Sequence, residues 1–117
     1  MLLCHEVGTV SVCVCMHCTE NRSVKYGDTV TLLCKASSDV DVKWTQTDTT
    51  SHVYVIYSDG AVFDNIRDRF AIVSTMPGEY NLQMLRANPS DAGRYVCDEL
   101  NHGSRTVLSQ YYLTVPG

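Results

Sequence analysis

One stretch of the sequence decides the fold: Asp91-Ala92-Gly93-Arg94-Tyr95-Val96-Cys97. Tyr95 and Cys97 are two residues apart, so on a β-strand both side chains point to the same face. A cysteine on that face can form a disulfide with a second sheet. A tyrosine two residues earlier can bury its ring and donate its hydroxyl to the backbone of the preceding corner. Gly93 permits the tight turn that leads into the strand.

Short strands separated by turn signals account for the rest of the chain. Apolar and polar residues alternate with a period of two, and no helical period is present. The predicted strands cover residues 29–35, 42–45, 52–57, 61–64, 69–74, 80–84, 95–99 and 106–115. Ser58-Asp59-Gly60 is a typical hairpin turn signal. This pattern predicts an all-β fold in which two antiparallel sheets pack as a sandwich.

Together with residues upstream, the opening stretch resembles the end of an immunoglobulin variable-type (V-set) domain. Cys34 precedes Cys97 by roughly sixty residues and Trp44 follows Cys34 by roughly ten, as in that family. The resemblance covers about residues 22 to 115 and implies a V-set domain over 19–117. It also implies a disulfide between Cys34 and Cys97 packed on Trp44, which contributes on the order of 4 kcal/mol in the chain-entropy model.

The resemblance implies two further features. Arg69, in the pair Arg69-Phe70, is expected to form a partly buried ion pair with Asp91 and so tie one strand to the corner before the next. The segment between the two cysteines has room for the extra C′ and C″ strands of the variable type. Antigen receptors usually open their last strand with Phe-Gly-x-Gly, and here that region reads Val107-Leu108-Ser109-Gln110. A germline-fixed receptor or adhesion molecule therefore fits better than a rearranged antigen receptor.

Composition limits the function classes. The chain has 117 residues, enough for one domain with a single two-layer core. A net charge of −4 with scattered Lys and Arg argues against nucleic acid as a partner. Six cysteines indicate an oxidising compartment, hence a cell-surface or secreted domain. No run of 18 apolar residues occurs, so a membrane anchor is expected outside this segment.

Residues 1–18 have two interpretations. Val10, Val12, Val14 and Met16 alternate with other residues, which favours an added or extended first strand. The alternative is a leader remnant, although no Lys or Arg precedes the apolar part. Shortly after this stretch, Asn21-Arg22-Ser23 matches the acceptor pattern for N-glycosylation, so we expect a glycan at Asn21.

Catalytic and metal chemistry find little support in the sequence. The cluster Cys13-x-Cys15-x-x-Cys18, with His5 and His17 nearby, has zinc-type ligands but lacks the second half of a zinc site. A disulfide or a processed leader explains these cysteines better. No nucleophile elbow or other catalytic signature occurs. We therefore predict no metal, no cofactor and no enzymatic activity.

Two recognition modes remain open. In the first, the sheet built from the C, C′, F and G strands binds a protein partner, either a second copy or a different protein. Its predicted outward residues are Thr45, Tyr57, Val96, Asp98, Gln110 and Tyr112. In the second, the B–C loop at 37–39 and the F–G loop at 99–104 bind antigen or a carbohydrate. The short F–G loop favours the first mode, because loop-based binding needs protruding loops. A purely structural spacer domain would show neither an exposed apolar face nor protruding loops.

Overall fold

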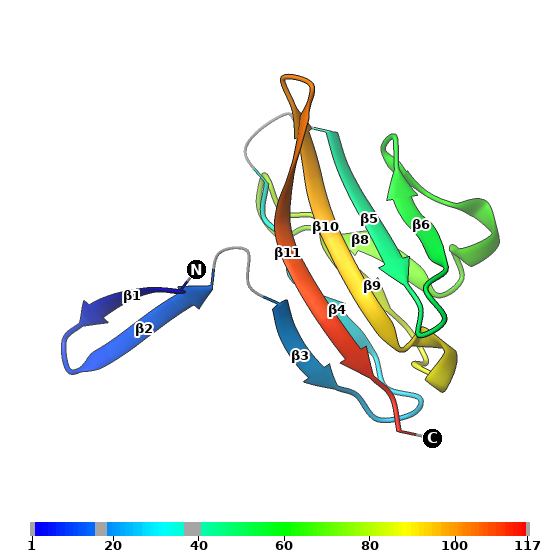
Figure 1. Ribbon diagram of the computed structural model, residues 1–117, viewed down its shortest axis with the longest axis horizontal. Coiled ribbons are helices and arrows are strands. Elements are labelled where there is room, and N and C mark those ends of the chain that lie inside the picture. Colours follow the sequence, from blue (N-terminus) through cyan, green and yellow to red (C-terminus); the bar gives the residue numbers. More distant parts are fainter. Residues whose placement is uncertain (1, 16–18, 37–40, 117) are drawn as a thin grey trace.

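Two β-sheets pack face to face in the computed structural model (Figure 1). It describes residues 2–15, 19–36 and 41–116, with the strands inside 2–15 given by their backbone alone. The larger sheet has six strands in the order β3 (Thr19–Ser23), β11 (Ser104–Thr114), β10 (Gly93–Asn101), β5 (Asp41–Thr47), β6 (Val53–Ser58) and β7 (Ala61–Val62). The smaller sheet has the order β4 (Val30–Leu32), β9 (Asn81–Met84) and β8 (Phe70–Val73). The predicted all-β two-sheet sandwich is confirmed.

Connections and pairing directions complete the topology. β3 pairs with β11 in parallel, and the other strand pairs are antiparallel. Two short 3-10 helices, η1 (Asp64–Ile66) and η2 (Pro89–Asp91), lie in the connections after β7 and β9. In the described part of the chain no helix is long and apolar enough to cross a membrane.

A disulfide between Cys34 and Cys97 joins the two sheets at the centre of the core. Trp44 on β5 is completely buried, and its ring stacks against Tyr111 with the centroids 6.3 Å apart. The indole N–H donates to the carbonyl of Tyr80 at 2.7 Å, so burying the indole leaves no unpaired donor. Side chains from both sheets surround this centre, among them Leu32, Val42, Ile56, Phe70, Leu82, Met84, Tyr95 and Leu113.

The corner before β10 is built as the sequence predicts, with one addition. The Tyr95 ring is fully buried, and its hydroxyl donates to the carbonyl of Asp91 at 2.6 Å. Gly93 has φ +137°, and a Cβ atom there would lie 2.3 Å from the Thr47 carbonyl oxygen. The glycine is therefore required by the close approach of β5 as well as by the turn.

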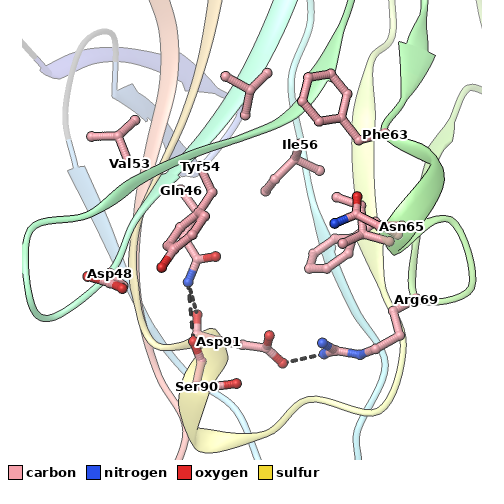
Figure 2. A pocket seen from close by; sticks show the side chains of 13 residues that line it. Gln46, Asp48, Val53, Tyr54, Ile56, Phe63, Asn65, Arg69, Ser90 and Asp91 are labelled. Atoms are coloured by element: carbon pink, nitrogen blue, oxygen red, sulfur yellow. Dashed lines mark hydrogen bonds and ion pairs between the residues drawn. The ribbon is translucent and has the colours of Figure 1, made fainter.

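Arg69 and Asp91 form the expected ion pair, and their side chains are 23% and 6% exposed (Figure 2). The Arg69 Nε group also donates to the Leu85 carbonyl at 3.2 Å, which ties the start of β8 to the end of β9. The Asp91 carboxylate accepts from the Asn88 amide at 2.9 Å and caps η2. One buried carboxylate thus organises the corner and links it to the smaller sheet.

The segment before β3 forms a hairpin. β1 (Leu2–Val7) and β2 (Val10–Cys15) pair antiparallel around a turn at Gly8 and Thr9 and make a sheet of their own. The alternating segment is therefore extended, and it pairs with a second strand rather than with the sandwich (Figure 1). Of the cysteine and histidine cluster noted in the sequence, His17 and Cys18 lie outside the described residues.

Two irregularities in register change the face of individual side chains. Between β5 and β6, Trp44 pairs with Tyr57 but Thr45 pairs with Val55, so Ile56 is an extra residue. Between β10 and β11, Cys97 pairs with Ser109 but Asp98 pairs with Val107, so Leu108 is an extra residue. A bulge thus occurs in β11 without the Phe-Gly-x-Gly sequence. Strict alternation from Gln110 and Tyr112 would place Leu108 on the outward face, but the bulge lets Leu108 pack against the core.

We expect Asp91→Ala to lower the free energy of unfolding by about 3 kcal/mol, because it leaves the partly buried Arg69 without its ion-pair partner and removes the Asp91 half of the capping box of η2. Asp68→Ala is the matched control, since it removes one partner of an ion pair whose side chains are 62% and 76% exposed. Its effect should stay within about 0.5 kcal/mol. Urea unfolding measures both, and equal effects of the two substitutions would contradict the buried-pair account.

Candidate functional site

The outward side of the larger sheet, here called the front face, is the candidate site. Strand register aligns its side chains in rows that cross the sheet. One row runs through Val55, Thr45, Val96, Gln110 and Thr19. The next row runs through Val53, Thr47, Arg94, Tyr112 and Asn21. These rows alternate with the inward residues of the core, so the front face follows directly from the position of the disulfide.

The chemistry of the front face is mixed apolar and polar. Val53 and Tyr112 lie in one row and are 64% and 48% exposed. Thr45, Val96 and Gln110 lie in the neighbouring row and are partly exposed. Arg94 is exposed beside Tyr112, its partner in register. Apolar side chains thus alternate with groups that can donate or accept hydrogen bonds.

Asp98 forms an ion pair with Arg105 at the end of the front face nearer the β10–β11 turn. Their side chains are 15% and 40% exposed. Lys43 is the register partner of Asp98 on β5. Charges of both signs therefore border the apolar rows at this end.

Tyr57 does not belong to the front face, so the prediction that its side chain points outward was wrong. The bulge at Ile56 turns Tyr57 inward, opposite Trp44, where it packs against the core. Its ring lies 6.3 Å from that of Tyr80. Burial raises the pKa of the Tyr57 hydroxyl, and Tyr80 and Asp41 raise it further. Strict alternation from Thr45 could not reveal this, because it assumes an unbroken register.

Among the front-face residues that sequence reasoning missed are Thr47, Arg94, Val53 and Val55. Thr47 and Arg94 lie two positions from Thr45 and Val96, so extending the same alternation would have found them. Val53 and Val55 depend on the register between β5 and β6, which the bulge shifts by one residue. Only pairing information could have placed these two valines.

The loops that the sequence predicted as an alternative binding site differ from those predictions in the structure. The predicted F–G loop at 99–104 is mostly strand, since β10 continues to Asn101 and β11 begins at Ser104. His102 and Gly103 form the turn between them, both with positive φ, as in a tight two-residue hairpin. Glu99 is buried rather than part of a loop tip. The B–C loop residues 37–39 lie outside the described residues.

The acceptor pattern at Asn21 lies on an exposed edge strand. Asn21 is exposed on β3, and its register partner on β11 is Tyr112. Its neighbour Arg22 points the other way, with its guanidinium 5.5 Å from the Tyr111 ring centroid. Among the described residues, no three His, Cys, Asp or Glu side chains gather as metal ligands.

Comparison of the sequence with models of known protein families identifies the family of this chain. The model of the immunoglobulin V-set domain matches residues 19–116, which is most of the chain. The chain belongs to the immunoglobulin V-set family. No curated protein matches the sequence. The resemblance seen in the cysteine, tryptophan and corner motifs is thus confirmed.

V-set membership fixes the broad class of function. V-set domains are recognition modules without enzymatic activity, and they generally bind proteins. A V-set domain with an internal disulfide is typical of extracellular proteins. In V-set terms, β5, β6, β10 and β11 are the C, C′, F and G strands, so the front face is the face predicted for binding.

The corrected position of Tyr57 has a direct test. We expect Tyr57→Ala to lower the free energy of unfolding by about 2 kcal/mol, since its ring packs on Tyr80 and the core. Tyr112→Ala should change it by less than about 0.5 kcal/mol, since Tyr112 is exposed on the front face. Thermal and urea unfolding measure both variants. An unbroken register between β5 and β6 would instead give equal, small effects.

Proposed function

We propose that this V-set domain is the extracellular recognition module of an immune-type receptor or adhesion molecule and binds a protein through its front face. The observation that supports this most is the row Val55, Thr45, Val96 and Gln110, together with Tyr112 in the next row. These residues share one surface across β6, β5, β10 and β11. A flat, rigid sheet can present them to a partner with little loss of conformational entropy.

The composition of the front face resembles that of protein interfaces. Interface centres are depleted in charge and enriched in aromatic residues, and polar groups surround them. Here Val96 and Thr45 occupy the middle, while Tyr112 supplies a large and stiff contact at one side. The Asp98–Arg105 pair and Arg94 supply the polar surroundings. The domain's negative net charge adds no attraction to nucleic acid or anionic membranes.

A glycan at Asn21 is compatible with binding at the front face. Asn21 lies on β3, at the edge of the sheet beside Tyr112, and the rows on β5 and β6 lie further from it. A sugar chain at this position would border the front face without covering its centre. It would also fit the extracellular location that the disulfide favours.

The alternative is recognition of antigen or carbohydrate by the loop ends. This mode needs protruding loops, and the β10–β11 connection is the two-residue turn His102-Gly103. The turn is exposed but offers a small contact area. The front face is therefore the better-supported binding site, and binding by the loops is one outcome that the experiment below can detect.

The proposal is tested by multimers of the domain binding to cells that display a library of surface proteins. Tyr112→Ala should weaken binding to the partner found at least tenfold, about 1.4 kcal/mol, because the ring lies within the proposed contact. Tyr26→Ala is the matched control, because Tyr26 is 68% exposed outside the front face. It should leave binding unchanged.

Two results would contradict the proposal. In the first, Tyr112→Ala and Thr45→Arg both bind as well as the parent while His102→Ala does not, which would move recognition to the loop end. In the second, the Tyr26 and Tyr112 variants lose binding equally, which would indicate contact outside the front face. Each variant must keep the parent's thermal transition for the comparison to count.

A further inference from the structure

We infer that two copies of this chain pair edge to edge along β6, so that their larger sheets join into one continuous sheet. This inference concerns the edge of the sheet and does not depend on the proposed role of the front face. It rests on an open strand edge, on the direction of its backbone groups and on the residues that form it.

The edge of β6 is only partly covered. β7 has two residues and pairs with Tyr57 and Ser58, and just beyond it the Phe63 amide donates to the Ile56 carbonyl at 3.2 Å. After β7 the chain leaves the sheet and enters η1, so within the described part of the chain Val53, Tyr54 and Val55 have a strand neighbour only on the β5 side. Half of β6 thus forms the free edge of the sheet.

The backbone groups of this free edge point outward at Val53 and Val55. The Asp48 amide donates to the His52 carbonyl at 2.9 Å across the β5–β6 turn. Because hydrogen-bonded and non-bonded pairs alternate in antiparallel strands, the next bonded pair is Gln46 with Tyr54. The N–H and C=O groups of Val53 and Val55 therefore face away from β5 and toward the open side.

The residues of this edge favour pairing with a strand like itself. Edge strands are usually protected by Lys, Pro or inward charges, and residues 51–58 contain no Asp, Glu, Lys, Arg or Pro. Val53 and Tyr54 are 64% and 51% exposed, and nearby Phe63 is 48% exposed. Two such edges meet without charge repulsion, despite the net charge of −4 on each chain.

When two β6 strands pair antiparallel, one register lets the outward N–H and C=O groups of Val53 and Val55 form hydrogen bonds between the copies. With a two-fold axis at Tyr54, Val53 of each copy lies opposite Val55 of the other, and each pair exchanges two backbone hydrogen bonds, about four in total. Sliding the strands would bring β7 of one copy against β6 of the other. The length of β7 therefore limits the pairing to this central segment.

Side chains on the two sides of β6 fit the same register. Figure 2 shows Tyr54 pointing toward Gln46 and Asp91, while Val53 points to the opposite side of the strand. Tyr54 borders a groove of about 530 Å³ that Phe63, Ile66 and Phe70 also line. At the two-fold axis the two Tyr54 rings meet over these grooves. On the other side, the four valines extend the front face of one copy into that of the next.

The paired segment is short, so the association is weak. A stable interface buries about 1,200 Å² or more, and three paired residues with one aromatic contact bury less. We expect a dissociation constant between about 10 μM and 1 mM, which supports pairing of copies held at high local concentration.

Sedimentation equilibrium of the full chain against concentration tests the inference, with two double variants that differ only in the sign of the charge at position 55. Val53→Lys with Val55→Lys places like charges opposite each other in both cross-copy pairs and should weaken association at least tenfold. Val53→Lys with Val55→Glu places opposite charges there and should restore association to within about threefold of the parent. Each variant is first shown to keep the parent's thermal transition as a monomer.

Amide hydrogen exchange separates this contact from others. Edge pairing should slow exchange at Val53 and Val55 as concentration rises, and Tyr112→Ala should leave association unchanged. A parent that stays monomeric to about 1 mM, equal association of the two double variants, or loss of association in Tyr112→Ala would each overturn the inference.

Discussion

The disulfide between Cys34 and Cys97, packed on Trp44, is the constraint on which the rest of the structure depends. It fixes the inward face of β10 and therefore the outward face as well, because side chains in a strand alternate. Val96 lies outside because Cys97 lies inside. A slip of one residue would exchange the core and the front face, so the buried bridge and the front face are two consequences of one register.

The corner before β10 holds the same register at the start of the strand. The Tyr95 hydroxyl bonds to Asp91, Asp91 pairs with Arg69, and Gly93 lets β5 approach closely. Gln46 adds its side-chain amide, 3.3–3.4 Å from the carbonyl oxygens of three residues of this corner. These polar groups are buried and satisfied, so the corner gains rigidity rather than losing stability to desolvation. The front face is thus carried by a strand, β10, that is held at its start by the corner and at its middle by the disulfide.

The fold could be predicted well because the sequence features that indicate it lie within single strands and turns. The spacing of Tyr95 and Cys97 and the turn at Gly93 need no knowledge of neighbouring strands. The faces of Tyr57 and Leu108 could not be predicted, because each depends on a bulge between two strands. A bulge is set by how two segments distant in sequence pair, and the pattern of one strand does not contain that information.

The same dependence on strand pairing explains which other residues of the candidate site could be predicted from the sequence. Thr45, Val96, Gln110 and Tyr112 lie on regular parts of their strands, and alternation placed them on the front face. The free edge of β6 was not visible in the sequence, since it results from the early end of β7. The proposed binding by the front face uses its outward side chains, whereas the proposed pairing at the edge of β6 uses the backbone groups of Val53 and Val55, whose side chains belong to the front face.

Nitration of the seven tyrosines, followed by mass spectrometry of the folded protein, tests the assignment of faces most directly. Tyr26, Tyr54 and Tyr112 are about half exposed or more and should react fastest. Burial raises the pKa of the Tyr57, Tyr95 and Tyr111 hydroxyls, which leaves less of the reactive phenolate, so these three should react slowly until the protein unfolds. If Tyr57 reacted as fast as Tyr112, the bulge at Ile56 and the front face drawn from it would be contradicted.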